Sequence, residues 1–192
     1  MLAGNNGQPL RFSDVFQSAG VSRGSAYRIY NGIDDLMQDL AAEWVQNFLQ
    51  HFAGIHPETV PKTWMELSDF IIKSGADYWA ATSNTLKVMP RIRSNAPASY
   101  KTTIHELSEC IAGLYARYFH IPDVPDWHYK LAFYTQLCDI TYSDAVRAEG
   151  KISDERLKLA QTLCKTYLGY YLPETVLPRK AADVTPIRST SA

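Results

Sequence analysis

The chain has 192 residues, enough for one mid-sized domain or for a small domain joined to a larger one. Apolar residues make up 46% of it and aromatic residues 12%, which excludes a chain that is disordered throughout. Its 19 basic and 20 acidic side chains give a net charge of −1, so a nucleic-acid partner has to be met by a local basic patch.

The spacing of apolar residues predicts helices along almost the whole chain. Two short helices are expected on either side of Gly20, followed by a long helix from Ile33 that Gly54 stops. The same spacing predicts further helices over residues 64–79, 85–89, 100–118, 126–149 and 153–171. No window shows the sustained alternation of a strand, so the predicted fold class is all-α.

Residues 11–36 carry the most informative pattern. Phe12, Val15, Phe16 and Ala19 predict a first short helix, and Ser22 is placed to cap a second one. Two short helices joined at a glycine are typical of a helix-turn-helix, whose second helix enters the DNA major groove.

The segment 19–25, Ala-Gly-Val-Ser-Arg-Gly-Ser, with Tyr27, Tyr30 and Leu36 after it, resembles the TetR (tetracycline repressor) family of transcriptional regulators. The resemblance implies a helix-turn-helix DNA-binding domain over residues 1–45 and a helical effector-binding and dimerisation domain over residues 46–178. The polar residues 179–192 are expected to form a flexible tail. Only the first of these regions carries the motif itself.

The resemblance also implies which side chains face double-stranded operator DNA: Arg11, Ser22, Arg23, Ser25, Tyr27 and Arg28. Arginines serve phosphates or guanine edges, and hydroxyl groups donate to phosphate oxygens. Ile29 and Ile33 stand where many relatives carry polar or cationic residues, which removes phosphate partners. A helix precedes the motif in the family, so we expect the first helix to be missing or truncated here, or the natural chain to start upstream of Met1.

The C-terminal domain is rich in aromatic side chains with few charges among them. Pockets between the helices of a bundle are built in this way, although each aromatic residue taken alone is more often part of the core. We therefore expect a small, neutral, apolar or aromatic effector that enters beside Phe70 and Ser74. The expected ligand-binding residues are Phe70, Ser74, Tyr78, Trp79, Met89, His105, Tyr115, Tyr134 and Cys138.

The last two predicted helices carry apolar residues on more than one face, more than a single core requires. We expect them to form a four-helix interface in a homodimer. The expected interface residues are Leu131, Phe133, Ile140, Leu157, Leu163, Tyr167 and Leu168.

Other chemistry finds little support in the sequence. The three cysteines form no CxxC pair, so a disulfide framework or zinc site is not expected; inert buried thiols are favoured over redox sensing. The histidines show no metal-ligand spacing, and no catalytic constellation is present, so we expect neither an enzyme nor a cofactor. No run approaches about 18 apolar residues and no leader pattern is found, which predicts a cytoplasmic protein without a membrane partner.

Together these features predict a ligand-responsive DNA-binding regulator, most simply a repressor that an effector releases from a palindromic operator. Effector binding would change the distance between the two DNA-reading helices of the dimer. The alternative is a helical small-molecule-binding or interaction protein that has lost DNA binding. Ile29, Ile33 and the absent first helix favour the alternative, whereas the intact pattern from Gly20 to Tyr30 favours the regulator.

Overall fold

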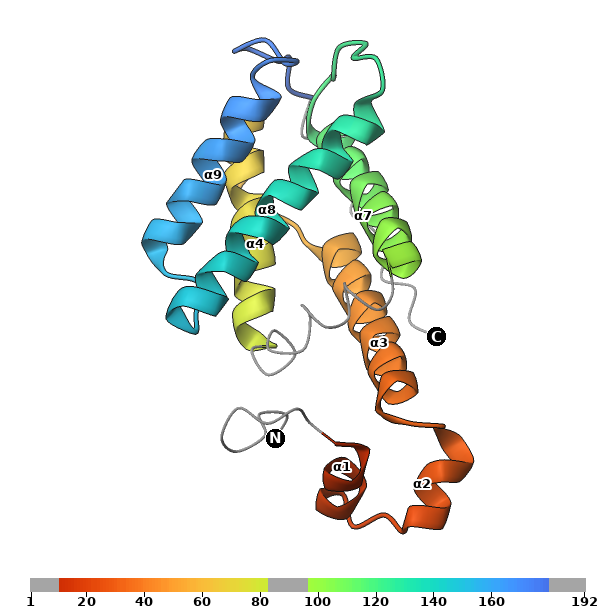
Figure 1. Ribbon diagram of the computed structural model, residues 1–192. Coiled ribbons are helices and arrows are strands. Elements are labelled where there is room, and N and C mark those ends of the chain that lie inside the picture. Colours follow the sequence, from red (N-terminus) through yellow and green to blue (C-terminus); the bar gives the residue numbers. More distant parts are fainter. Residues whose placement is uncertain (1–10, 83–96, 180–192) are drawn as a thin grey trace.

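The computed structural model describes residues 11–82 and 97–179 (Figure 1). Within these two ranges the chain forms seven helices, and its only strand-like pairing is an isolated bridge between Phe119 and Pro178. The predicted all-α class is therefore confirmed. Helices α1 and α2 project at one end of the molecule, and α3 joins them to a body built from the remaining helices (Figure 1).

The projecting end consists of α1 (Phe12–Ser18) and α2 (Arg23–Ile29). Gly20 turns the chain between them with a φ of +67°, a left-handed conformation that is accessible to glycine without steric cost. Ser22 then starts α2, because its hydroxyl oxygen accepts a hydrogen bond from the Ser25 backbone N–H at 3.2 Å. The turn and the cap together give the predicted helix-turn-helix.

A small hydrophobic cluster holds these two helices together. Phe12, Phe16 and Ala26 are its buried members, and Ile33 and Leu36 pack against it from α3. The large Phe16 side chain and the small Ala26 side chain thus belong to the same cluster. Ile33, which the sequence suggested as a lost phosphate contact, contributes to this packing instead.

Helix α3 (Ile33–Gly54) runs without a break from the helix-turn-helix into the body. The Asp35 carboxylate accepts hydrogen bonds from the backbone N–H of Asn31 at 3.0 Å and from its side-chain amide at 2.7 Å, which fixes the start of α3. The boundary expected at residue 45 therefore falls inside a helix that both parts of the molecule share.

The body is formed by α4 (Trp64–Ala81), α7 (Pro97–Tyr118), α8 (Trp127–Glu149) and α9 (Asp154–Leu168) together with the second half of α3. Helix α8 packs against α7 and α9, α4 packs against α9, and α3 packs against α7. A half-buried ion pair of 2.7 Å between Lys165 and Asp69 also joins α9 to α4. Gly150 ends α8 with a φ of +72°.

Several sequence predictions fall on residues outside the described ranges. They are the short helix over residues 85–89, the helix or loop before residue 11, and the tail from residue 180 onward. Arg179, at the start of the expected tail, donates a hydrogen bond from Nε to the Ala116 carbonyl at 2.7 Å. In the described ranges no helix combines the length and the apolar character needed to cross a membrane.

Candidate nucleic-acid interface and effector cavity

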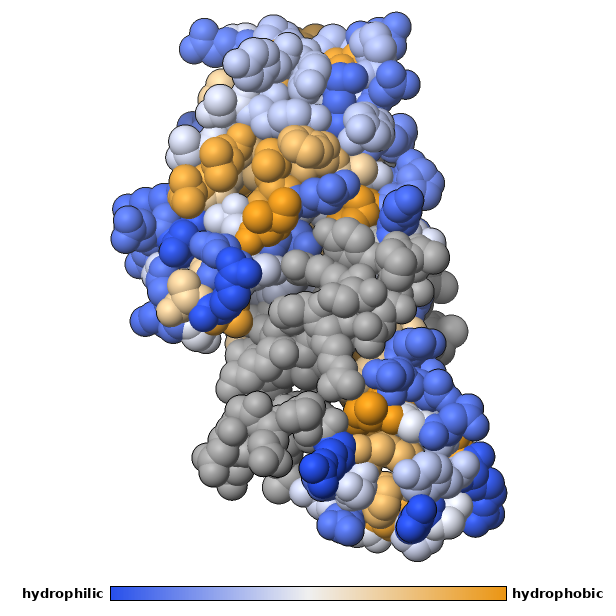
Figure 2. All heavy atoms as spheres, in the orientation of Figure 1, coloured by the Kyte–Doolittle hydropathy of each residue, from blue (hydrophilic) through white to orange (hydrophobic). Residues whose placement is uncertain are grey.

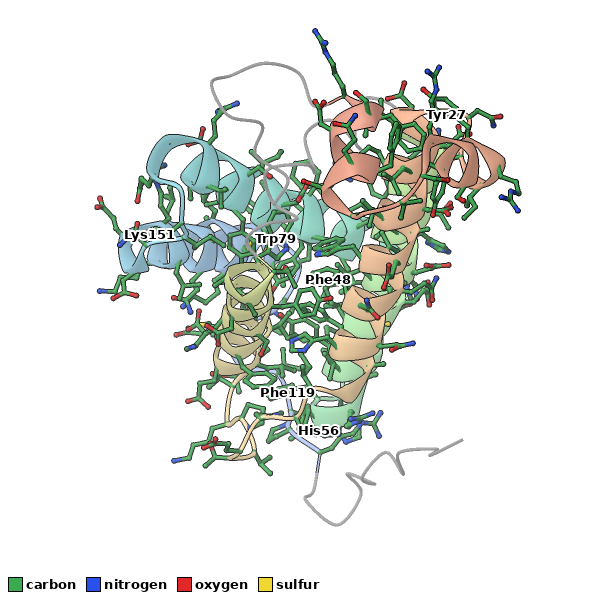
Figure 3. The ribbon with its side chains drawn as sticks, turned by 90° about the horizontal axis from the view of Figure 1, so that it is seen from below. Tyr27, Phe48, His56, Trp79, Phe119 and Lys151 are labelled. Carbon is green, nitrogen blue, oxygen red and sulfur yellow. The ribbon has the colours of Figure 1, made fainter. Side chains whose placement is uncertain are left out.

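The outer face of α2 presents the side chains that the sequence assigned to DNA. Tyr27 is 47% exposed, and its ring packs edge-on against Phe12 with centroids 5.2 Å apart. The Arg23 guanidinium lies 5.5 Å from the centroid of the Tyr27 ring, and Arg28 is exposed in the last turn of the helix. Figure 3 shows Tyr27 at the edge of the molecule, away from the interior side chains Phe48 and Trp79. The tyrosine thus supports an arginine on a solvent-facing surface.

The remaining predicted DNA-facing residues lie around the start of each short helix. Arg11 is exposed immediately before α1, and its backbone N–H donates to the Asp14 carboxylate at 3.3 Å. Ser22 is exposed, whereas Ser25 is half-buried and its hydroxyl oxygen accepts a hydrogen bond from that of Ser22 at 3.0 Å. The Ser25 proton stays available to a phosphate or a base edge. Ile29 is 71% exposed, so this surface also carries an apolar side chain.

A cavity of about 330 Å³ lies in the body between α3, α4, α7 and α8. Its volume is within the range of sites for small organic ligands. Its exposed lining residues lie on α3 and α7: Gln38, Ala42, Gln46, Thr102 and Glu106. The cavity therefore reaches the surface beside these two helices.

One end of the cavity is a wall of aromatic rings. The rings of Trp44 and Phe48 stack with centroids 4.9 Å apart, and Trp79 meets Trp44 edge-on at 5.5 Å. Tyr142 closes the wall from α8, 6.1 Å from Trp79. Figure 3 places Phe48 and Trp79 in the interior between α3 and α4. Gly75 lies against this wall, and a Cβ there would stand in van der Waals contact with the Phe52 ring at 3.4 Å.

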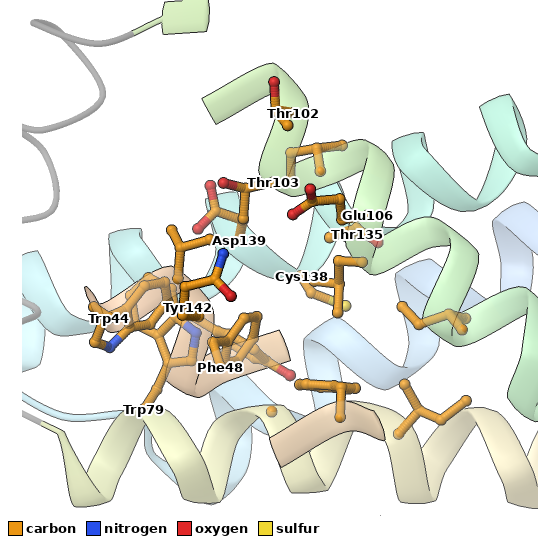
Figure 4. A pocket seen from close by; sticks show the side chains of 18 of the residues that line it. Trp44, Phe48, Trp79, Thr102, Thr103, Glu106, Thr135, Cys138, Asp139 and Tyr142 are labelled. Carbon is orange, nitrogen blue, oxygen red and sulfur yellow. The ribbon is translucent and has the colours of Figure 1, made fainter. Parts of the chain in front are cut away.

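The other end of the cavity is polar. Figure 4 shows the side chains of Thr102, Thr103 and Glu106 from α7 and of Asp139 from α8 gathered there, away from the aromatic rings. This polar end was not among the sequence predictions, which placed few charges in the domain. The signal that could have found it is the spacing of Thr135, Asp139 and Tyr142, which puts three polar or amphipathic side chains on one face of α8.

Only part of the predicted ligand set lines this cavity. Trp79, Tyr134 and Cys138 do so, and Met89 lies outside the described residues. Phe70, Ser74, Tyr78, His105 and Tyr115 do not line it, so their expected role in ligand binding finds no support in this cavity.

The physical reasons differ among these five residues. The cavity is lined from α4 by Ile71, Ile72, Gly75 and Trp79, so the side of that helix holding Phe70 and Ser74 faces elsewhere. Tyr78 packs behind the wall, 5.1 Å from the Phe48 ring. His105 is on the exposed face of α7. Tyr115 is fully buried and packs 5.8 Å from Trp127.

Sequence reasoning also missed the contribution of α3. The apolar spacing of Trp44, Phe48 and Phe52 indicates only that they share one face of this helix. All three line the cavity. The spacing alone does not separate a core stripe from a cavity wall, because both require the same side chains.

Two of the cysteines, distant in sequence, meet between α8 and α9. The sulfur atoms of Cys138 and Cys164 lie 3.4 Å apart. The hydrogen bond between the Cys138 and Cys164 thiols and burial both raise the pKa of Cys138 well above its ordinary value. A thiol held in its neutral form is a poor nucleophile, so this pair fits the inert role better than redox sensing.

The exposed face of α8 and α9 is apolar. Figure 2 shows hydrophobic side chains gathered on the surface over these helices. Its most exposed predicted interface residue is Ile140 at 62%, and Phe133, Leu159 and Leu163 are also exposed. We call these four residues the α8–α9 patch. Leu157 and Tyr167, from the predicted interface set, are half-buried.

Two residues of the predicted dimer interface are misplaced. Leu131 and Leu168 are fully buried in the core of the single chain, so they offer no surface to a partner. Both come from helices with apolar residues on several faces, and sequence spacing did not show which face meets the chain's own core.

Comparisons with known proteins agree with this architecture. The structure is similar to that of a TetR-family transcriptional regulator from Streptomyces coelicolor, with a TM-score of 0.61 and 18% sequence identity. The match covers 89% of this chain and 92% of that one. The chain therefore has a TetR-like fold. No protein-family model matches the chain, and no curated protein matches it by sequence.

Proposed function

We propose that the protein is a DNA-binding transcriptional regulator that acts as a homodimer and responds to a small-molecule effector. The single observation that carries the proposal is the exposed face of α2, where Arg23, Tyr27 and Arg28 stand on a helix-turn-helix with a fixed turn and cap. The similarity to a TetR-family regulator supports it at the level of the fold.

The effector part of the proposal is supported by the cavity and by its position on α3. The wall residues Trp44, Phe48 and Phe52 belong to the same helix as Ile33, which packs against the helix-turn-helix cluster. An effector that binds one arrangement of α3 better than another shifts the protein toward that arrangement. Release of operator DNA is then a coupling free energy between two sites, which makes a repressor the simplest form of the regulator.

The dimer part is supported by the α8–α9 patch. Two symmetric copies of such a patch can cover each other, since a two-fold interface pairs the same surface of both subunits. Two α2 helices would then read a palindromic operator with half-sites about one helical turn apart.

The test is selection of bound sequences from random DNA by the purified protein, followed by affinity measurements over a range of salt. Arg28→Ala should weaken binding to every sequence and reduce the salt dependence by about one ion per half-site. Arg23→Ala should relax the preference at one base pair by about 1–3 kcal/mol. Arg147→Ala is the matched control, because this arginine is 81% exposed and pairs with Asp144 on α8.

The outcomes separate the two readings of the sequence. If Arg23→Ala reduces the affinity for operator DNA and for random DNA by the same factor, Arg23 binds phosphate and does not read bases. If no sequence is enriched, or if Arg147→Ala weakens binding as much as Arg28→Ala, DNA recognition by α2 is refuted. The protein is then better described as a helical small-molecule-binding protein.

A further inference from the structure

The charged side chains of the effector cavity all have the same sign. Among the lining residues that the structure describes, Glu106 and Asp139 are acidic, and no lysine, arginine or histidine is present. Asp139 already interacts with another part of the protein. Glu106 is exposed where the cavity meets the surface on α7. The electrostatic potential that Glu106 contributes at this opening favours a positive ligand.

Several hydroxyl groups that line the cavity are already hydrogen-bonded within the protein. The Tyr142 hydroxyl donates to the Ile72 carbonyl at 2.6 Å, and the Thr135 hydroxyl donates to the Leu131 carbonyl at 2.9 Å. The hydroxyls of Tyr134 and Ser68 bond to each other at 3.1 Å. An anionic ligand needs donors, so it would be desolvated here without gaining them from these groups.

The aromatic end suits a cation for a different reason. The rings of Trp44, Phe48, Trp79 and Tyr142 carry negative charge density on their faces, and tryptophan is the strongest partner for a cation. A ligand that fills the cavity lies between these rings and the carboxylates (Figure 4). Both ends therefore favour positive charge.

We propose that the effector is an organic cation, an ammonium or a similar delocalised cation carried on an aromatic or apolar body. This inference rests on the proposed function, and it replaces the neutral effector expected from the sequence. The body lies against the aromatic wall, and the positive group is balanced by Glu106.

The experiment compares three probes of one shape that differ in charge. They are naphthylmethyl-trimethylammonium, its neutral analogue with carbon in place of nitrogen, and naphthylmethanesulfonate. Calorimetry and quenching of the fluorescence of Trp44 and Trp79 give the affinities. The cation should bind about tenfold or more tightly than the neutral analogue, and the anion should bind most weakly. The preference should shrink with added salt.

Glu106→Gln tests the assignment without removing the shape of the side chain. It should weaken binding of the cation about threefold or more and leave the neutral analogue unchanged. Glu109→Gln is the control on the same helix, because Glu109 pairs with His128 at 2.8 Å and does not line the cavity. Unchanged melting temperatures of the free variants show that the fold is intact.

Each result decides the question. Equal or tighter binding of the neutral analogue overturns the cationic class, as does a failure of all three probes to bind. Equal effects of Glu106→Gln and Glu109→Gln overturn the role of Glu106. The same probes added to the protein–DNA complex separate this inference from the proposed function: release by the neutral analogue alone refutes the cation and retains the regulator.

Discussion

Replacing Ile140 by glutamate should convert the proposed dimer into folded monomers. Ile140 lies on α8 with 62% of its surface exposed, in the middle of an apolar patch that one chain does not cover. In the isolated subunit the substitution touches only solvent, so its effect on stability should stay within about 0.5 kcal/mol. The substitution should instead weaken the association of two subunits.

The magnitude follows from the exposed area. Burying a whole isoleucine side chain is worth about 1.5–3 kcal/mol, so burying the exposed 62% is worth about 1–2 kcal/mol per copy. Two-fold symmetry doubles this to about 2–4 kcal/mol. The dissociation constant should therefore rise about 30-fold to 700-fold, and more if the new carboxylates meet no partner.

Leu168→Glu is the matched variant that separates interface from core. Leu168 is fully buried, so the substitution loses about 2–5 kcal/mol of packing and forces a carboxyl group into an apolar site. That loss is comparable to the whole stability of a domain, about 5–15 kcal/mol. This variant should unfold or aggregate.

Light scattering after size exclusion, together with circular dichroism, distinguishes these results. Wild type should be dimeric at micromolar concentration, Ile140→Glu monomeric and helical, and Leu168→Glu largely unfolded. A dimer that survives Ile140→Glu with unchanged affinity would refute the assignment of the α8–α9 patch. A folded Leu168→Glu protein would refute the placement of that side chain in the core.

Three further predictions concern the fold of the single chain. Gly20→Ala should lower the free energy of unfolding by about 1 kcal/mol because the φ of Gly20 is +67°, whereas Gly24→Ala, inside a helix, should raise it by about 0.5–1 kcal/mol. At either site an added Cβ would meet nothing within 4 Å, so the two variants differ only in backbone conformation. If thermal denaturation ranks the two variants in the opposite order, the conformational argument is wrong. Tyr142→Phe removes the hydroxyl group that donates to the Ile72 carbonyl at 2.6 Å, so it should lower the free energy of unfolding by about 1–3 kcal/mol. Urea denaturation measures this difference, and a loss of less than about 0.5 kcal/mol would mean that the hydrogen bond contributes little. Hydrogen bonds from Arg156 and from the Ser153 hydroxyl lower the pKa of Glu149, so its stabilising contribution is present above the ordinary carboxyl pKa of 4.5 and is lost as the pH falls below it, through the lowered pKa of the folded state. The melting temperature of Glu149→Gln should therefore fall less on acidification than that of the wild type. If both proteins lose the same melting temperature at acidic pH, the predicted stabilising role of ionised Glu149 is wrong.

Local signals made the helix-turn-helix predictable. The turn at Gly20 and the cap at Ser22 act within a few residues of themselves, and the structure shows both. The long apolar stripe of α3 was equally readable, from Ile33 to its end at Gly54. Such features depend on backbone conformation and on helical period, which the sequence specifies directly.

The cavity and the inner and outer faces of α8 were not predictable in the same way. Leu131 and Ile140 are both aliphatic residues of one helix, yet one is fully buried and the other largely exposed. A helix that is apolar on several sides does not reveal which side meets its own chain. A cavity is a space left between four helices, and its position depends on how they cross. His105 was expected at such a space and lies in solvent, one residue from the buried Ile104.

Helix α3 connects the cavity wall to the helix-turn-helix as one continuous helix. At 1.5 Å per residue, the first turn at Ile33 lies about 22 Å from Phe48 in the cavity wall. A ligand that tilts the helix by about 5° around Phe48 would carry the helix-turn-helix about 2 Å sideways, since a stiff rod magnifies a small rotation by its length. In a two-fold dimer the paired arms would open or close by about twice that distance, roughly one base-pair step of the duplex. In the proposed regulator, a ligand in the cavity would thus change the position of α2 through one continuous helix, with no need for a chain of side-chain contacts.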